Sequence, residues 1–458
     1  MSQHLWSGRF DAAPDPAAFD FGVSFPLDRR LFEDDVTGSL AWAEALVACG
    51  AVSADDGRMI QEGLSDILEQ GRRDPAWVTG GDEDVHSFVE RQLVARIGDA
   101  GRRLHTGRSR NEQVAVDLRL YLRRRIPSLQ AKLKALVGTL AAQADAAGVT
   151  LMPSYTHMRR AMPVMAAHFL LSHAAALRRD HHRLGVAAVE ADALPLGSGA
   201  IAGTGYAIDV QRLAARLGFS RVVANSMDAS SDRDFAATFV YASALAMVHL
   251  SRIAEDFILF TSEEFGFFEL ADKSATGSSM MPQKKNPDPL ELVRGKTGRV
   301  IGHLTGLLVT IKGLPTGYNK DLQEDKEPVF GSEDTLAVSL DATRAVIGSV
   351  TLRADRTRLA ASGLLLATDV ADYLVGRGVS FRQAHEIVGS MVRQLLTDGR
   401  DFEGLSVDDW RRFSSHFGDD VREAVTPEAS VKARKTPQST GPDAVRAALA
   451  ETRAWLSS

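Results

Sequence analysis

The segment that decides the fold, residues 114–144, reads VAVDLRLYLRRRIPSLQAKLKALVGTLAAQA. Its apolar residues, including Leu118, Leu122 and Leu133, recur mostly at steps of three and four. That spacing places them on one face of an α-helix. We therefore predict one extended amphipathic helix here, in which Pro127 favours a bend.

Two further segments have a helical period and are apolar on most faces. Residues 236–265 include Phe239, Leu250 and Phe257, and a third run extends from Leu290 to Leu308. Helices that are apolar nearly all round are buried. Several such helices in mid-chain predict a bundle whose core includes contacts between subunits.

Strand signals are scarce in this chain. Alternating β-branched runs are short, and residues 149–155 and 221–224 form at most small edge strands. We predict an all-α fold with three helical domains at residues 1–103, 104–353 and 354–458. The second of these is the domain of the long helical bundle.

Composition excludes several classes of protein. Of the 458 residues, 45% are hydrophobic and 24% are charged, which is typical of a globular protein rather than a disordered or fibrous one. The net charge of −6 gives no basic face for nucleic acid or a membrane surface, so we expect neither partner. Any anion must be bound locally.

The sequence also predicts a reducing, cytoplasmic location. Cys49 is the single cysteine, so no intramolecular disulfide and no thiolate metal cage can form. The first residues lack a basic start followed by an apolar run, and we find no uninterrupted apolar stretch long enough for a membrane span. His385-Glu386 and Asp82–Asp84 lack the spacing of zinc and calcium motifs, so we assign no metal.

A loop with the chemistry of an anion site spans residues 277–287, GSSMMPQKKNP. It combines hydroxyls, two ammonium groups and an amide, while its prolines forbid a continuous helix. Asp288 suits the N-cap of the helix that follows, Pro289 its first position and Glu291 its third. The alternative interpretation is an ordinary polar surface loop.

Two polar clusters lie near predicted helix boundaries or turns. Residues 105–113, HTGRSRNEQ, directly precede the long helix, where a helix N-terminus favours an anion. Their alternative role is an elaborate helix cap. Residues 155–160, YTHMRR, contain His157, whose alternative role is that of a hydrogen-bonded structural histidine.

Two other segments carry weaker signals. Residues 195–205, PLGSGAIAGTG, approximate a dinucleotide fingerprint, but no strand precedes them and no P-loop lysine follows, so we predict a close-packed turn between helices. Residues 317–328, GYNKDLQEDKEP, are dense in charges of both signs, which is usual for a solvated face.

Taken together, these segments resemble a known enzyme family. The 277–287 loop resembles the signature of the fumarase and aspartase superfamily. The full set of matching segments is similar to the argininosuccinate lyases. That family in turn resembles the delta-crystallins. The resemblance covers essentially the whole chain. Two departures are Gly107, where we expect an alanine, and Glu112, where we expect an aspartate. The matching segments are WSGRF at 6–10, HTGRSRNEQV at 105–114, YTHM at 155–158, DRDF at 232–235, GSSMMPQKKNPD at 277–288, the 317–328 segment and ATDVADYL at 367–374.

The resemblance implies a β-elimination that splits argininosuccinate into fumarate and arginine without a cofactor. Ser278 matches the family's catalytic base, which needs nearby positive charge, and Lys284 is the expected partner. His157 matches the histidine on the acid or leaving-group side. Glu291 matches the carboxylate that orients this histidine, a role that competes with helix capping.

The resemblance also implies substrate contacts and an assembly. The succinate carboxylates are expected to meet Asn111, Thr156, Lys284 and Asn286, with Arg110 beside them. The arginine end is expected to meet Ser24, Asp84, Tyr318, Gln323 and Lys326. The family further implies a homotetramer around the helical bundle, with each active site assembled from three chains.

Two alternatives remain open from the sequence. Other lyases of the superfamily act on adenylosuccinate, aspartate or malate, but residues 318–328 resemble the arginine-releasing branch. A structural protein related to the delta-crystallins is also conceivable, although Ser278, His157, Asn111 and Lys284 are all present, which favours an enzyme.

Overall fold

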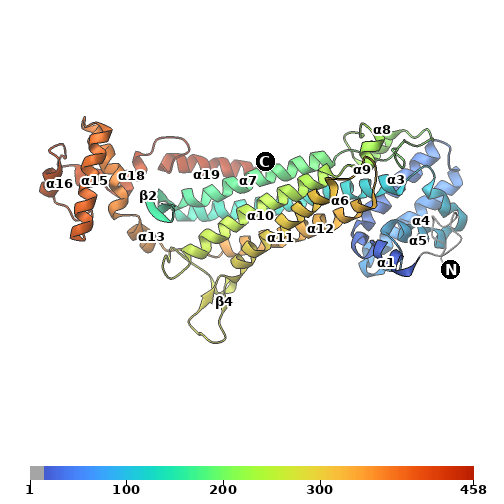
Figure 1. Cartoon of the computed structure of the whole chain (residues 1–458), viewed down its shortest axis with the longest axis horizontal. Helices are drawn as coiled ribbons and strands as arrows, with labels where there is room; N and C mark the ends of the chain where they lie inside the picture. Colours follow the sequence, from blue (N-terminus) through green and yellow to red (C-terminus); the bar gives the residue numbers. More distant parts are fainter. Residues whose placement is uncertain (1–14) are drawn as a thin grey trace. The chain divides into compact units, whose positions relative to one another are not determined.

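The computed structural model describes residues 15–458, and the predicted WSGRF motif at 6–10 lies outside them. The described chain is mostly helical (Figure 1). It divides into two compact units, each built from three stretches of sequence. The first unit runs to Gln130 and adds His182–Ala244 and Arg299–Thr335; the second contains Ala131–His181, Leu245–Gly298 and Leu336–Ser458.

The first unit begins with short helices around an aromatic core. Trp42 and Phe88 are fully buried, and the Phe88 ring lies 5.2 Å from both Phe25 and Trp77, centroid to centroid. Side-chain caps set where two of these helices begin: Ser53 accepts from Asp56 N, and Asp84 accepts from Ser87 N. The elements are α1 (Pro16–Gly22), α2 (Phe25–Asp28), α3 (Phe32–Ala48), α4 (Ala54–Arg73) and α5 (Val85–Ile97), with the 3₁₀ segments Arg29–Leu31, Pro75–Trp77 and Gly98–His105.

Five long helices confirm the predicted long-helix pattern. The segment quoted at the outset forms α6, which continues through Pro127 without a break, and residues 236–265 and 290–308 fall largely within α10 and α11. The five are α6 (Arg110–Ala147), α7 (Ala166–Ala191), α10 (Asp234–Phe260), α11 (Asp288–Ile311) and α12 (Lys326–Ile347).

Buried polar contacts join these helices within each unit. In the first unit, Glu333 of α12 pairs with Arg125 of α6 at 2.5 Å. In the second unit, His249 Nδ1 of α10 lies 2.7 Å from Asp180 Oδ2 of α7, and Thr297 Oγ1 of α11 donates to the Met247 carbonyl at 3.1 Å. The apolar faces of the helices supply most of the packing, and these contacts fix how they align.

The strands are few and short, as expected. The predicted strand at 149–155 is β1, whereas at 221–224 only Val222 forms an isolated bridge, to Leu194. The antiparallel pairs are β1 (Leu151–Thr156) with β2 (Arg159–Met165), β3 (Phe268–Glu269) with β6 (Thr351–Leu352), and β4 (Thr276–Gly277) with β5 (Lys285–Asn286).

Smaller helices complete both units. Those of the C-terminal part pack around Leu374, Trp410 and Phe417, which are at most 1% exposed. The remaining helices are α8 (Val210–Leu217), α9 (Ser226–Ser231), α13 (Ala354–Ala360), α14 (Ala367–Gly376), α15 (Phe381–Asp398), α16 (Val407–Phe413), α17 (Val421–Ala424), α18 (Pro427–Ala433) and α19 (Pro442–Ser457), with 3₁₀ turns at Asp272–Ser274, Lys320–Asp325 and Gly363–Leu366.

Among the described residues, α10 is long and apolar enough to cross a membrane by length and composition. Its residues Phe239, Leu250 and Phe257 are fully buried against other parts of the protein. A core helix of a large bundle has the same composition as a membrane span, because both are apolar nearly all round. We therefore interpret α10 as a core helix.

Candidate active site

A cavity of about 590 Å³ lies in the first unit. Parts of the chain far apart in sequence line it: the start of α2, the α5 region, the start of α6, and the segment from Tyr318 to Lys326. Seven of the predicted site residues meet here, namely Ser24, Asp84, Arg110, Asn111, Tyr318, Gln323 and Lys326. The other six, Thr156, His157, Ser278, Lys284, Asn286 and Glu291, belong to the second unit.

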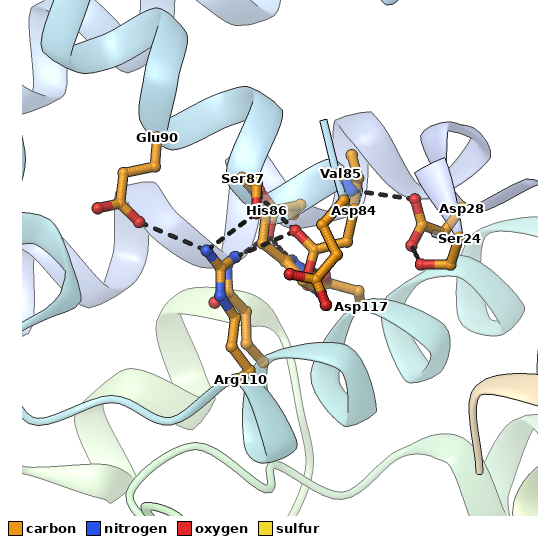
Figure 2. A network of polar contacts seen from close by, with 12 residues as sticks. Ser24, Asp28, Asp84, Val85, His86, Ser87, Glu90, Arg110 and Asp117 are labelled. Atoms are coloured by element: carbon orange, nitrogen blue, oxygen red, sulfur yellow. Dashed lines mark hydrogen bonds and ion pairs between the residues drawn. The ribbon is translucent and has the colours of Figure 1, made fainter. Parts of the chain in front are cut away.

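Arg110 and Asp84 lie next to each other in the lining of the cavity. Arg110 is the first residue of α6, and in Figure 2 its guanidinium points toward the helix α5 that carries Ser87 and Glu90. Its Nη1 lies 3.6 Å from Asp84 Oδ1, and its Nη2 lies 3.5 Å from Glu90 Oε2. Two carboxylates therefore share one guanidinium, so the wall offers both a cation and anions to a ligand.

Ser24 and Asp28 form a second polar pair at the cavity. Ser24 Oγ donates a hydrogen bond to Asp28 Oδ2, and Asp28 Oδ1 accepts from Val85 N at 3.0 Å (Figure 2). Burial raises the pKa of Asp28 from 3.8 to about 6, although the Ser24 hydrogen bond opposes the rise. The only hydroxyl proton of Ser24 is used in the hydrogen bond to Asp28. The Ser24 oxygen can therefore only accept a hydrogen bond from a ligand, which suits a cationic group.

Another part of the lining comes from the segment predicted to be a solvated face. Lys326 is only 2% exposed, and its Nζ donates to Asp325 Oδ1 at 3.0 Å. Gln323 Nε2 donates to the Gly22 carbonyl at 3.2 Å, which ties this wall to the one that carries Ser24. Burial raises the pKa of Tyr318 to about 12, so its phenol remains a neutral donor. These buried groups make the segment part of a site.

Sequence reasoning missed several residues that line the same cavity. Asp28 lies one helical turn after Ser24, while Ser87, Glu90 and Arg91 follow Asp84 at helical spacing. A test for polar residues at steps of three and four from Asp84 would have found the α5 members. Burial raises the pKa of Glu90, with the nearby Asp84 and Asp35 charges adding to the rise.

A buried acidic cluster lies behind this wall. His86 Nδ1 is 2.7 Å from Asp35 Oδ1 and 3.4 Å from Asp117 Oδ2, and all three residues are at most 5% exposed. Burial holds the pKa of Asp117 well above its usual range, and the negative charge of the neighbouring Asp35 adds to the rise. Burial and the neighbouring carboxylate thus favour the neutral form of Asp117. The buried guanidinium of Arg108 supplies further compensating charge.

In the second unit, His157 lies at the tip of a tight hairpin. Thr156 pairs with Arg159, so His157 and Met158 alone form the turn, with φ angles of 53° and 57°. Two left-handed residues match the turn type that suits the twist of a two-residue hairpin. The His157 side chain is exposed and makes no hydrogen bond to any described residue. The hairpin thus presents it to solvent.

The predicted anion loop begins and ends in the short β4–β5 ladder. Ser278 Oγ accepts from Met280 N at 3.3 Å and from Met281 N at 3.1 Å, which makes a local turn. Lys285 Nζ is bound to Asp272 at 2.7 Å, whereas the Lys284 ammonium has no hydrogen bond or ion pair with any described residue. Of the two lysines, Lys284 is therefore the one available to a ligand.

The helix after this loop begins one residue earlier than predicted. Asp288 is the first residue of α11 rather than its N-cap, and its carboxylate accepts from Thr276 Oγ1. The Thr276 hydroxyl, from strand β4, donates to a carboxylate oxygen of Asp288 that would otherwise be available to cap the helix. Glu291 is exposed and forms no capping hydrogen bond within the described chain, so its side chain is free of the capping role.

Comparison with known families places the chain. Residues 8–302 match the family described as Lyase, and residues 364–432 match the family described as Argininosuccinate lyase C-terminal. The chain is thus a member of the lyase family. It is 48% identical to the argininosuccinate lyase of Desulforudis audaxviator over 99% of both chains, and 49% identical to that of Thiobacillus denitrificans over 99% of this chain and 98% of the relative. The chain therefore belongs to the argininosuccinate lyase family.

Solved structures agree on the fold. EDDS lyase in complex with formate superimposes with a TM-score of 0.85 at 27% identity, covering 97% of this chain and 92% of the other. The 3-carboxy-cis,cis-muconate lactonizing enzyme of Pseudomonas putida superimposes with a TM-score of 0.75 at 19% identity, covering 96% and 99% of the two chains. The latter likeness concerns the fold alone.

The raised pKa of Asp28 predicts a specific pH dependence of stability. Because its folded-state pKa of about 6 exceeds the ordinary 3.8, its contribution to the free energy of unfolding is greatest below pH ~4 and is lost as pH rises through 6. Asp28→Asn removes this titration. Between pH 4 and 7, the unfolding free energy of the wild type should therefore fall by about 2 kcal/mol relative to the variant.

Urea unfolding at a series of pH values, followed by circular dichroism, measures this difference. Asp66→Asn, which changes an exposed aspartate of α4, is the matched control. The control should follow the wild type at every pH. Parallel curves for the wild type and Asp28→Asn would contradict the assignment of the buried titration to Asp28.

Proposed function

We propose that the chain cleaves argininosuccinate by β-elimination, releasing fumarate and arginine in arginine biosynthesis. The observation that carries this proposal is the full-length match to argininosuccinate lyases, 48% identical over 99% of both chains. The cavity supports it, because its wall offers carboxylates and cations to a substrate that carries three carboxylates and a guanidinium. Asp84 and Arg110, 3.6 Å apart, provide one of each charge.

We place the arginine end of the substrate against Ser24, Asp84, Tyr318, Gln323 and Lys326. The Ser24 oxygen accepts a hydrogen bond from a cationic group, because the Ser24 hydroxyl proton is already hydrogen-bonded to Asp28. Asp84 attracts a guanidinium or ammonium, while the buried Lys326 and the neutral phenol of Tyr318 donate to a carboxylate. This wall thus matches both charges of an amino acid with a cationic side chain.

We place the succinate end near the N-terminus of α6. Arg110 and Asn111 begin that helix, where free N–H groups and the helix dipole favour an anion. Thr156, Lys284 and Asn286 complete the binding of the two carboxylates. These three residues come from the second unit, so we infer that the assembled enzyme brings them to the cavity.

In the chemical step, Ser278 removes the proton next to the succinate carboxylate as the base. The electron pair moves onto that carboxylate to form a dianion, which Lys284 and Asn286 stabilise. The C–N bond then breaks, and His157, oriented by Glu291, assists departure of the guanidino nitrogen. Side chains move every proton, so we propose that no cofactor or metal takes part.

We propose a homotetramer in which each site draws on three chains. Exposed apolar residues along α11 support an assembly: Leu292 is 59% exposed, Ile301 44% and Val309 54%. Several exposed apolar side chains on one helix are typical of a surface that another subunit covers. We expect the assembled enzyme to be cytoplasmic, with no nucleic-acid or membrane partner.

One assay tests this function against its alternatives. The purified chain is given argininosuccinate, adenylosuccinate, aspartate and malate in turn, and fumarate is measured by its ultraviolet absorbance. We expect fumarate from argininosuccinate alone, in amounts equal to the arginine released. Fumarate from another substrate would indicate a different superfamily lyase, and none from any would favour a structural protein.

A further inference from the structure

The glycine-rich segment 195–205, which the proposed mechanism leaves without a role, adjoins the candidate site. It connects α7 to α8 and turns back on itself, with Gly203 N donating to the Ser198 carbonyl at 2.8 Å. Gly197 and Gly199 have φ angles of 103° and 60°, which favour glycine. A Cβ on Gly199 would lie 2.7 Å from the Gly203 carbonyl oxygen, so the turn has no space for a side chain there.

Glu112 of α6 binds this turn with a buried carboxylate. Its Oε2 accepts from Gly197 N at 2.7 Å and from Gly199 N at 2.9 Å, while its Oε1 accepts from Ser109 N at 3.1 Å. The residue is 0% exposed. Burial raises the pKa of Glu112, and the three N–H groups and Arg108 oppose that rise by favouring the charged form. One side chain thus joins the glycine turn to the start of the long helix.

The same turn holds the neighbouring residue of the cavity. Asn111 Nδ2 donates to the Ala200 carbonyl at 3.2 Å, directly after the glycine that Glu112 binds. An asparagine amide has two N–H donors and one acceptor oxygen. The contact with Ala200 uses one donor and fixes the amide plane, which leaves the other polar atoms for a ligand in the cavity that Asn111 lines.

The far side of the turn has anchors of its own. Ser226 Oγ donates to the Ile201 carbonyl at 2.8 Å. A Cβ on Gly317 would lie 2.8 Å from Ile201 Cδ1, so the isoleucine packs directly over the residue before Tyr318. Loss of Glu112 therefore removes the side-chain anchor of Gly197 and Gly199, next to Ala200, while Ile201 keeps its own contacts.

We propose that Glu112 is a positioning residue that sets the amide of Asn111 for the succinate end of the substrate through the turn at Gly197–Ala200. Glu112 touches no ligand itself. The arginine end is placed against other residues of the cavity that Glu112 does not contact, namely Ser24, Asp84, Tyr318, Gln323 and Lys326. This inference rests on the proposed role of Asn111 in binding succinate, and it names the residue that makes that binding specific.

The test compares one change that removes the carboxylate charge and one that fills space in the turn with matched controls in the full-length enzyme. Glu112→Gln keeps the shape but places an NH₂ group against an N–H donor. Gly199→Ala keeps the charge but places a Cβ 2.7 Å from the Gly203 carbonyl oxygen, which distorts the turn that Glu112 binds. The controls are Glu62→Gln on the exposed face of α4 and Gly205→Ala in the same segment, where a Cβ meets nothing within 4 Å.

Inhibition by each product provides the readout. In Glu112→Gln and Gly199→Ala, we expect the inhibition constant of fumarate to rise about tenfold, as for a lost hydrogen bond, while that of arginine changes less than about twofold. Glu112→Asp keeps a charged acceptor and should restore fumarate inhibition to within about threefold of the wild type. The double variant Glu112→Gln/Gly199→Ala should have a fumarate inhibition constant no higher than that of the more affected single variant, because both changes break the same contact.

Several outcomes would overturn the inference. One is unchanged fumarate inhibition in the folded Glu112→Gln enzyme; another is an equal loss of fumarate and arginine inhibition, which indicates general loosening. If Glu112→Gln fails to fold, Gly199→Ala decides in the same way. The wild type is assayed first: a wild type that releases no fumarate from argininosuccinate refutes the proposed function, whereas a failed inference appears only in the variants.

Discussion

Ser278→Ala is expected to lower kcat by about a thousandfold or more while KM changes little. Ser278 lies in a loop and binds only the backbone N–H groups of Met280 and Met281, so the methyl group of alanine disturbs little packing. Loss of the hydroxyl removes the proposed base. An interaction made only in the chemical step reduces kcat, whereas ground-state binding is preserved.

The adjacent serine is the natural control for this prediction. Ser279→Ala makes the same chemical change one residue further along an exposed part of the loop. Steady-state fumarate release and circular dichroism of both variants measure activity and folding. Turnover within tenfold of the wild type in Ser278→Ala, or equal losses in the two variants, would reject Ser278 as the base.

The second large effect is the recovery of activity when two inactive variants are mixed. Ser278→Ala and His157→Asn are each expected to be inactive as homotetramers. If a site takes these two residues from different chains, random reassembly at equal amounts leaves both intact in about a quarter of sites. Activity should therefore return to about 25% of the wild-type value from a baseline near zero.

The experiment denatures the two variants together, refolds them and assays fumarate release. Each variant refolded alone is the control, and tagged subunits separated on two affinity columns verify the mixed tetramers. Mixed tetramers without recovered activity would show that Ser278 and His157 of each site lie in one chain.

The long helices were predictable from sequence because their periodicity is a local property. The expected helix from Val114 to Ala144 is α6, Arg110–Ala147, and the run from Leu290 to Leu308 lies within α11, Asp288–Ile311. Each apolar stripe continues for many turns, so its period outweighs the single proline at 127. Helix ends were less certain, and Asp288 shows the reason: a hydroxyl from β4 binds the oxygen that local rules assign to a cap.

The candidate site was predictable only in part. Resemblance supplied residues such as Asp84, Arg110 and Lys326, which the structure brings to one cavity. It did not supply Asp28, or the contact of Glu112 with Gly197, because these depend on segments brought together by folding. The charged run at 317–328 shows the same limit. Its composition is typical of a surface, yet Lys326 is buried in a cavity that segments far away in sequence also line. The division into three domains and the shared site remain predictions.

The two-residue turn at His157 and Met158 limits how this part of the chain can vary. Thr156 and Arg159 are already paired, so the connection has no spare length. An insertion of one residue would lengthen the turn or shift the pairing of β1 with β2, and a shift by one exchanges the two faces of a strand. Substitutions that accept a left-handed backbone can be absorbed at Met158, but changes of length cannot. The hairpin thus fixes the distance along the chain between His157 and Tyr155, whose ring packs against Phe260 and Phe265.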